Sequence, residues 1–175
     1  LSLIIMKNSK LGDASTAKSL YDFSAYDAKG NLVSLEKYAG KVVVIVNVNE
    51  NCTHAEAHYK AFNELLKKYG ETKGLCILAF PCDQFLTHSK SNSETMETII
   101  NNPEQNCDFF AKIDVNGGSA HPLWQWLKKK TPIVGVNFIT WNFTKFIVDR
   151  NGHPVERSTP STKPMAMENT LLRLF

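Results

Sequence analysis

The sequence predicts an α/β domain built on a central mixed sheet flanked by helices. Two continuous apolar runs, residues 41–49 (KVVVIVNVN) and 74–80 (GLCILAF), show little polar alternation, which is typical of strands buried on both faces of a sheet. Residues 54–69 lie between them and place apolar side chains at helical spacing, with Gly70 as a stop signal. Strand, helix and strand therefore form a βαβ unit with parallel strands and a right-handed crossover.

The other segments are expected to complete this domain. Residues 21–40 alternate between apolar and polar side chains on either side of Lys29, Gly30 and Asn31, which predicts an N-terminal β-hairpin. A second hairpin is expected over 143–156, around Asn151 and Gly152. The further predictions are helices at 95–102, 120–130 and 167–175 and an edge-like strand at 108–115.

Length and composition exclude several classes of protein. A chain of 175 residues with 43% hydrophobic side chains fits one ordinary domain, which we place at residues 19–175, after a poorly ordered extension at 1–18. The formal charge of +3 is too small to indicate nucleic-acid binding without a clustered basic face. No apolar run approaches the roughly 18 to 20 residues that span a bilayer.

The four cysteines do not resemble a disulfide framework or a metal site. They have no short repeated spacing and no CxxC pair. Cys52 with His54 and His58 is the one cluster of zinc-ligand residue types, but two solvated histidines on a helix surface explain the same spacing more economically. We therefore expect no metal and no bound cofactor.

Cys52 is the candidate reactive thiol. It lies between a predicted buried strand and the start of the next helix, where free backbone N–H groups and the helix dipole favour an anion and hence a thiolate. Cys76 lies inside an apolar strand run. Position alone leaves open whether Cys52 is reactive or fills space in the core, because free cysteine is among the most buried residue types.

Long motifs resemble the glutathione peroxidase family. The segments are NVNENC (47–52), LAFPCDQF (78–85), VNGGSAHPLWQWLK (115–128) and WNFTKFIVDRNG (141–152), which occur in the family's order. The resemblance covers nearly everything from Tyr21 onwards and is closest to the monomeric phospholipid-hydroperoxide type. It implies a thioredoxin-like fold and a peroxidase that acts on hydrogen peroxide or lipid hydroperoxides.

The resemblance also implies a set of site residues. Cys52 falls on the peroxidatic cysteine or selenocysteine, and Trp141 and Asn142 fall on the two residues that hold it. An indole N–H and an amide NH₂ can donate hydrogen bonds to a thiolate, which would favour and orient the nucleophile. The alternative for Trp141 is a core anchor. Whether Cys52 stands where a relative has selenocysteine is left open.

Two departures from the family's pattern put activity in doubt. His88 takes the place of the catalytic glutamine, in a loop that has also lost the family's glycine and proline. An imidazole can donate a hydrogen bond or accept the thiol proton, and the alternative is a solvated loop histidine. Glu50 places a carboxylate near Cys52, which would oppose ionisation of the thiol. The rival hypothesis is therefore a catalytically impaired relative that acts as a redox sensor or binding protein.

The resemblance further suggests how Cys52 is regenerated. Cys107 is the nearest candidate for a resolving cysteine, but it falls on an aromatic position of the family, so we expect it to be buried. A small thiol such as glutathione is therefore the preferred reductant. Gln84 and Cys82 are interpreted as structural residues. We expect a monomer in the cytoplasm, with secretion as the alternative. A cationic rim could contact an anionic thiol or lipid headgroups, and its members are Lys128, Lys129, Lys130, Lys145 and Arg150.

Overall fold

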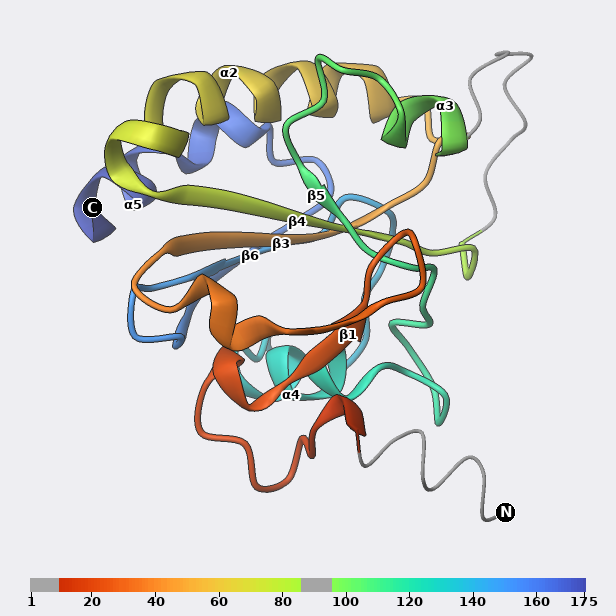
Figure 1. Cartoon of the computed structure of the whole chain (residues 1–175). Coiled ribbons are helices and arrows are strands. Elements are labelled where there is room, and N and C mark those ends of the chain that lie inside the picture. The colour runs from red at the N-terminus through yellow and green to blue at the C-terminus, as the bar shows by residue number, and fades with distance from the viewer. Residues whose placement is uncertain (1–9, 86–95) are drawn as a thin grey trace.

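A computed structural model describes residues 10–85 and 96–175 of the chain. Within these residues, five strands form a mixed sheet in the order β5-β4-β3-β6-β7 (Figure 1). Strand β3 at its centre pairs in parallel with β4 and antiparallel with β6, so the predicted βαβ unit and mixed sheet are confirmed. The strands are β3 (Val42–Val48), β4 (Leu75–Pro81), β5 (Asp108–Phe109), β6 (Lys145–Val148) and β7 (Pro154–Ser158).

Helices cover both faces of the sheet, which gives the thioredoxin-like α/β fold that the resemblance implies. Helices α2 (Ala55–Lys73) and α5 (Glu168–Leu174) lie on one face. Helix α4 (Pro122–Lys130) and the predicted N-terminal hairpin lie on the other (Figure 1). The remaining elements are β1 (Ser24–Tyr26), β2 (Leu32–Ser34), α3 (Met96–Ile100), η1 (Leu20–Asp22), η2 (Leu35–Tyr38) and η3 (Pro164–Met167).

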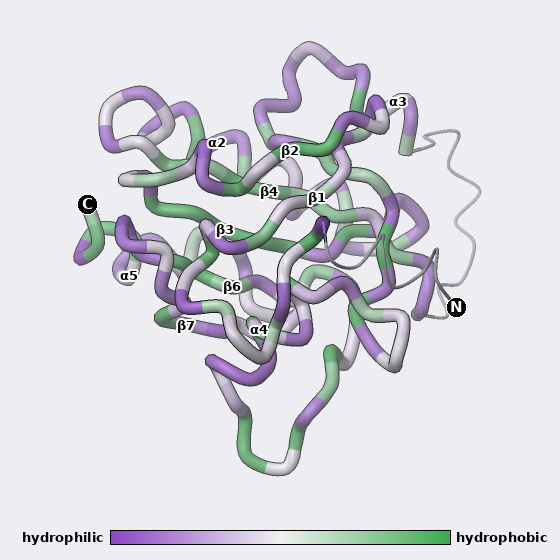
Figure 2. The backbone as a smooth tube through the Cα atoms, turned by 60° about the horizontal axis from the view of Figure 1, so that its bottom comes forward, coloured by the Kyte–Doolittle hydropathy of each residue, from purple (hydrophilic) through white to green (hydrophobic). Residues whose placement is uncertain are grey.

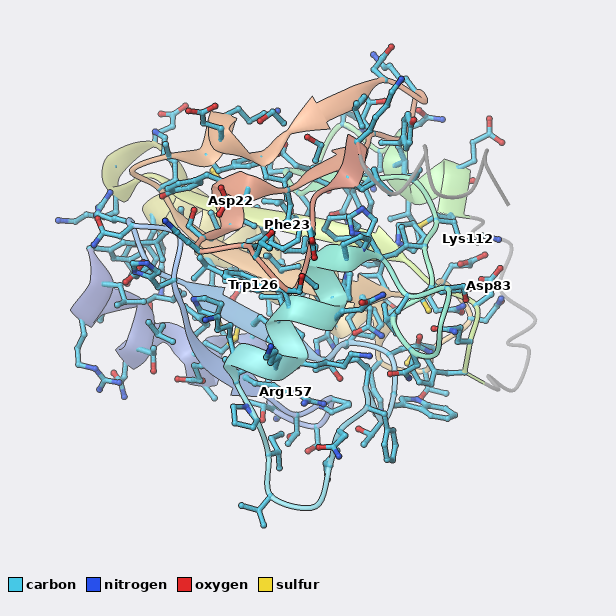
Figure 3. All side chains as sticks on the ribbon, turned by 90° about the horizontal axis from the view of Figure 1, so that it is seen from below. Asp22, Phe23, Asp83, Lys112, Trp126 and Arg157 are labelled. Carbon is cyan, nitrogen blue, oxygen red and sulfur yellow. The ribbon has the colours of Figure 1, made fainter. Side chains whose placement is uncertain are left out.

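Strand β3 separates two halves of the core. All seven of its residues are buried, and successive side chains point to opposite faces of the sheet. Its valines at 42, 44, 46 and 48 join the cluster beneath α2, whereas Val43 and Ile45 join the cluster on the α4 side. The hydropathy colouring follows this interior run (Figure 2). On the α4 side, the rings of Phe23 and Trp126 lie 5.3 Å apart (Figure 3).

Helix α2 corrects the prediction that Gly70 ends it. The helix runs through Gly70 to Lys73 and ends at Gly74, which has φ +71° and donates its N–H to the Gly70 carbonyl. A left-handed residue is what closes this kind of helix end, and only glycine adopts it at low cost. Gly70 has an ordinary helical backbone, so its presence lowers helix propensity without ending the helix.

Strand β5 is much shorter than the predicted strand over 108–115. After Phe109 the backbone alternates between two strands: Phe110 and Ile113 donate their N–H groups to the Ala79 and Pro81 carbonyls of β4, and Ala111 donates to the Tyr26 carbonyl of β1. Because the N–H group of Ala111 points to β1 instead of β4, the strand pairing with β4 does not continue as a regular ladder. The second hairpin, β6 with β7, is confirmed around Asn151 and Gly152.

Part of the N-terminal segment is described. Within 10–18, the Ala17 carbonyl accepts a hydrogen bond from the Trp126 indole at 3.2 Å, and the Lys18 N–H donates to Asp22 at 2.7 Å. The proposed boundary between residues 18 and 19 stays a prediction. In residues 10–85 and 96–175, no helix is long and apolar enough to cross a membrane.

Candidate active site

Cys52 lies in the turn that joins β3 to α2, at the end of the sheet where the two parallel strands finish. Its N–H donates to the Asn49 carbonyl at 3.2 Å, and its own carbonyl accepts from Ala55, the first residue of α2, at 3.0 Å. The side chain is 4% exposed. The predicted position of the thiol before a helix is confirmed, and the positive end of α2 faces the same turn.

A cavity of about 210 Å³ brings Cys52 together with Trp141 and Asn142, almost ninety positions further along the chain. These two residues lie in the turn that precedes β6, the strand next to β3. The antiparallel pairing of β3 and β6 brings the beginning of β6 to the end of β3. The full lining comprises Cys52, Thr53, His54, His58, Trp141, Asn142, Phe143, Pro160 and Ser161.

Asn142 is the most unusual polar group in this cavity. It is 1% exposed, yet neither its Nδ2 nor its Oδ1 atom has a hydrogen-bond partner among the described residues. A buried amide without partners costs free energy, so its retention points to a partner that enters the cavity. Trp141 differs, because it is 39% exposed and its ring lies 5.8 Å from Phe85. It is therefore not a core anchor.

The turn that carries these residues is held in a strained conformation. Phe143 has φ +63° and is the one non-glycine residue with positive φ among those described. Asn47 on β3 holds the turn from below: its carbonyl accepts from Phe143 N–H at 2.7 Å and its Nδ2 donates to the Trp141 carbonyl at 3.1 Å. Its Oδ1 also accepts from Thr144 N–H at 3.0 Å.

His58 corrects the prediction of two solvated histidines. His54 is exposed, but His58 is buried at 6% exposure and stacks on Phe143 with ring centres 4.5 Å apart. Its Nδ1 lies 2.9 Å from the His54 carbonyl, and its Nε2 lies 3.4 Å from Lys145 Nζ. Burial, with the Lys145 charge adding to it, lowers the pKa of His58 to about 4, so the ring is neutral near pH 7.

The cationic rim predicted from the sequence is wrong for Lys128, Lys145 and Arg150, whereas Lys129 and Lys130 are exposed. Lys145 is fully buried and Lys128 is partly buried, with its ammonium donating to the Val115 carbonyl at 2.6 Å. Arg150 donates to three backbone carbonyls, among them that of Gly40 at 2.7 Å. The cationic groups of these three side chains are engaged in hydrogen bonds with backbone carbonyls.

Tyr59 is a further buried group near Cys52. It is 4% exposed, its ring meets Phe143 edge to face at 5.9 Å, and its hydroxyl has no partner among the described residues. Burial raises the pKa of Tyr59 well above its usual value, and Cys107, Glu50 and Cys52 add to this electrostatically. The phenol therefore stays protonated and can only act as a hydrogen-bonding group.

Cys107 and Gln84 are the other residues that the sequence singled out. Cys107 is 8% exposed, and burial raises the pKa of its thiol to about 12. All four cysteines are free thiols. Gln84 is bound to the backbone, accepting from Val115 and Asn116 at 2.7 and 2.9 Å. At the same end of the sheet, Lys112 and Asp83 form an exposed ion pair (Figure 3).

His88, expected to replace the catalytic glutamine, lies outside the described residues. Across 10–85 and 96–175, no three His, Cys, Asp or Glu side chains are arranged to hold a metal ion.

Comparison with known proteins identifies the family. Residues 20–128 match the model of the glutathione peroxidase family. The chain belongs to the glutathione peroxidase family. It is 41% identical over 155 residues to the probable glutathione peroxidase 2 of Arabidopsis thaliana, covering 88% of this chain and 91% of that protein.

A further relative and a solved structure agree with this. The phospholipid hydroperoxide glutathione peroxidase of Pongo pygmaeus is 40% identical over 161 residues, which cover 91% of this chain and 81% of that protein. The crystal structure of Trgpx in its apo form superposes with a TM-score of 0.74 at 31% identity, covering 91% of this chain and 96% of that one. Glutathione peroxidase sequence and thioredoxin-like fold thus coincide over most of the chain.

Three residues that shape the site were not predicted in this role: Asn47, and also His58 and Lys145, which were expected on the surface. Two of them carried a signal. Asn47 is a polar residue inside a strand otherwise made of valine and isoleucine, and Lys145 is a charged residue at the beginning of an apolar strand. The burial of His58 gave no such signal, because positions 54 and 58 are equally compatible with an exposed helix face.

Proposed function

We propose that this glutathione peroxidase homologue is a thiol-dependent peroxidase with Cys52 as its attacking group. The observation that carries the proposal is Asn142, a buried amide that finds no hydrogen-bond partner in the described part of the chain and lines the same cavity as Cys52. Such an amide can donate to the sulfur of a thiolate and to an oxygen bound to it. Trp141, on the exposed side of the cavity, can donate from its indole in the same way.

The reaction follows from the chemistry of a thiolate and a peroxide. The Cys52 thiolate attacks the terminal oxygen of the hydroperoxide, an S–O bond forms and the O–O bond breaks, and the alkoxide leaves as an alcohol after taking a proton. Cys52 becomes a sulfenic acid. One thiol then forms a mixed disulfide with release of water, and a second thiol releases Cys52 with formation of a small disulfide.

The reductant is proposed to be glutathione or a similar small thiol rather than Cys107. A thiol with a pKa of about 12 is protonated near neutral pH, and the thiolate is the form that attacks a sulfenic acid. Tyr59 interacts electrostatically with both Cys107 and Cys52, so its ring lies in the same part of the core as the two thiols.

His88 and the substrate complete the proposal. We assign His88 the place of the family's glutamine, as a hydrogen-bond donor or proton acceptor for Cys52. Hydrogen peroxide, fatty-acid hydroperoxides and phospholipid hydroperoxides are all candidate substrates. The name of the Pongo relative, a phospholipid hydroperoxide glutathione peroxidase, supports including the last of these.

The experiment is a steady-state assay of hydroperoxide consumption with glutathione as reductant. The wild type should consume hydroperoxide and Cys52→Ser should not, whereas Cys107→Ser should retain its rate. Equal rates for wild type and Cys52→Ser would refute the proposal. A rate lost with Cys107→Ser, together with a disulfide between residues 52 and 107 found by mass spectrometry, would replace the one-cysteine cycle by a two-cysteine cycle.

The second candidate function is a redox sensor or binding protein that has lost turnover. Glu50 supports it, because its carboxylate lies two positions before Cys52 and is close enough to Tyr59 to interact with it electrostatically. A negative charge near the thiol opposes formation of the thiolate. Glu50→Gln separates the candidates: a working peroxidase should react moderately faster without the carboxylate, and a protein that does not turn over should stay inactive.

A further inference from the structure

Lys145 is a buried cation behind the wall of the Cys52 cavity. Its side chain is fully buried at the beginning of β6. Its two strand neighbours, Val46 on β3 and Ser158 on β7, carry no charge. None of the ion pairs formed within 10–85 and 96–175 includes it. A buried charge without a counter-charge is costly, so its retention calls for a physical reason.

The three donors of this ammonium reach three different segments. Lys145 Nζ lies 2.7 Å from the Phe143 carbonyl, 3.4 Å from the Pro160 carbonyl and 3.4 Å from His58 Nε2. Because His58 Nδ1 lies 2.9 Å from the carbonyl of His54 and must donate to it, Nε2 is the acceptor toward Lys145.

All three acceptor residues line the cavity that also contains Cys52. The ammonium therefore connects α2, the strained turn before β6 and the loop after β7, at the place where each contributes to the cavity. The groups that face it are neutral: a histidine ring that stays unprotonated near pH 7, two backbone carbonyls and the side chains of Val46 and Ser158. The Glu156 carboxylate on β7 is held by the hydroxyls of Ser158 at 2.8 Å and Thr170 at 2.6 Å, and it forms no ion pair with Lys145. An anion formed in the cavity would lie on the side of the ammonium where its three acceptors are.

We propose that Lys145 is a positioning residue of the Cys52 site, which ties three walls of the cavity together and favours the thiolate of Cys52 through its positive charge. The inference rests on the proposed role of Cys52 as the attacking thiol. Burial lowers the pKa of Lys145 to about 8, so the charge is present at neutral pH and is lost in mildly alkaline solution.

The test measures alkylation of Cys52 by iodoacetamide as a function of pH, because iodoacetamide reacts with the thiolate and requires no peroxidase activity. Mass spectrometry follows the tryptic peptide 42–60, which contains no other cysteine. The variants are Lys145→Met, which removes donor and charge, and Lys145→Gln, which keeps a donor. Lys128→Met is the matched control, since Lys128 is a partly buried lysine bound to a backbone carbonyl elsewhere.

Both Lys145 variants should be alkylated about tenfold more slowly than the wild type at pH 7, with the difference narrowing above pH 8. Lys128→Met should match the wild type. Identical pH profiles for the wild type and the Lys145 variants would overturn the inference. A slow Lys145→Met with a normal Lys145→Gln would overturn the role of the charge and leave only the tie between the walls.

A reciprocal experiment does not depend on folding of the Lys145 variants. Coupling between two sites is mutual, so replacing the thiol by a hydroxyl must change the proton affinity of Lys145 by the same factor. NMR titration of Lys145 in the wild type and in Cys52→Ser should show it titrating about one pH unit lower in the variant. Equal titrations would refute the inference. If the wild type shows this coupling between Lys145 and Cys52 but does not turn over peroxide, the proposed reaction is refuted and the inference about Lys145 is not.

Discussion

The side-chain amide of Asn47 donates to the backbone carbonyl of Trp141 at 3.1 Å, across 94 positions of sequence. The same amide accepts from Thr144 N–H at 3.0 Å, so one buried side chain on β3 fixes both ends of the turn that carries Asn142. The turn contains the positive φ of Phe143, which a free segment would not keep. The geometry of the cavity therefore depends on a residue that does not line it.

Asn47→Ala should loosen the site as well as destabilise the fold. It removes both side-chain hydrogen bonds and leaves the Thr144 N–H buried without a partner, which should cost about 2–3 kcal/mol of unfolding free energy. Urea denaturation measures this cost, and peroxide oxidation of Cys52 should slow under conditions where the variant is still folded. Asn63→Ala, which loses amide contacts on α2, is the control. Unchanged oxidation in a destabilised Asn47→Ala would show that the turn does not position the site.

Asn142→Ala should act on chemistry and hardly on stability. Its amide has no hydrogen-bond partner within residues 10–85 and 96–175, so its removal breaks no hydrogen bond there. Loss of one preorganised donor typically lowers a rate by about 10²–10³-fold. Oxidation kinetics and thermal unfolding should therefore show that Asn142→Ala slows oxidation at nearly unchanged stability, whereas Asn47→Ala slows oxidation and lowers stability. A large loss of stability in Asn142→Ala with normal oxidation kinetics would mean that the amide stabilises the fold and does not take part in the reaction.

Tyr59→Phe should leave the protein as stable as the wild type, or more stable. The Tyr59 hydroxyl is buried without a partner among the described residues, and such a group is costly to keep. Tyr38→Phe is the matched control, because the Tyr38 hydroxyl donates to Asp108 at 2.7 Å and its removal should cost about 1–3 kcal/mol. A Tyr59→Phe variant as destabilised as Tyr38→Phe would reveal a hydrogen bond to the Tyr59 hydroxyl.

Stability should fall as the pH drops below about 6.5, the ordinary pKa of histidine. Burial lowers the pKa of His121 to about 4, and that of His58 likewise. Between the two values the unfolded chain binds protons that the folded protein excludes, so each histidine contributes up to about 1.4 kcal/mol of lost stability per pH unit. Above pH 6.5 this contribution is constant.

His121→Asn isolates one of the two contributions. The His121 Nδ1 atom accepts from Leu123 N–H at the start of α4, and asparagine can replace that cap. Urea denaturation at pH 7 and pH 5 should show a smaller loss of stability in His121→Asn than in the wild type, whereas replacement of the exposed His153 should leave the loss unchanged. The same loss in all three proteins would contradict the assignment.

The two glycines at the end of α2 should respond to alanine with opposite signs. Gly70→Ala should stabilise by about 0.5–1 kcal/mol, because the backbone is helical and the added methyl would meet nothing closer than 3.8 Å. Gly74→Ala should destabilise by about 1–2 kcal/mol, since φ is +71° and the methyl would lie 3.1 Å from Lys41. Urea denaturation measures the unfolding free energy of both variants. Destabilisation by Gly70→Ala would contradict the finding that α2 continues past Gly70 to Lys73.

The sequence carried most of the fold because its signals are local. The apolar run from Val42 to Val48 and the helical spacing over 54–69 each depend on neighbouring residues alone. Two predicted element ends were wrong because contacts between distant segments set them. Helix α2 continues past Gly70. Strand β5 ends at Phe109, since Phe110 donates to β4 but Ala111 donates to β1. Local pattern contains no information about which distant carbonyl an N–H will reach.

The candidate site divides in the same way. Cys52 could be singled out from its place before a helix, and Trp141 and Asn142 from the family motif. The support behind them could not. Asn47 reaches the turn at 141–144 through a contact that the pairing of β3 with β6 creates. Lys145 reaches His58 and Pro160 through contacts between distant segments. The predicted cationic rim failed for the same reason, since a lysine in a motif can be wholly buried.

The most direct test of the account is stopped-flow oxidation of the reduced protein by hydrogen peroxide and by a lipid hydroperoxide, followed by tryptophan fluorescence with Cys52→Ser as control. The account predicts oxidation far faster than that of free glutathione under the same conditions, with the fluorescence change absent in Cys52→Ser. Oxidation of the wild type no faster than that of an ordinary thiol would contradict it, and would leave a glutathione peroxidase fold that serves binding or signalling.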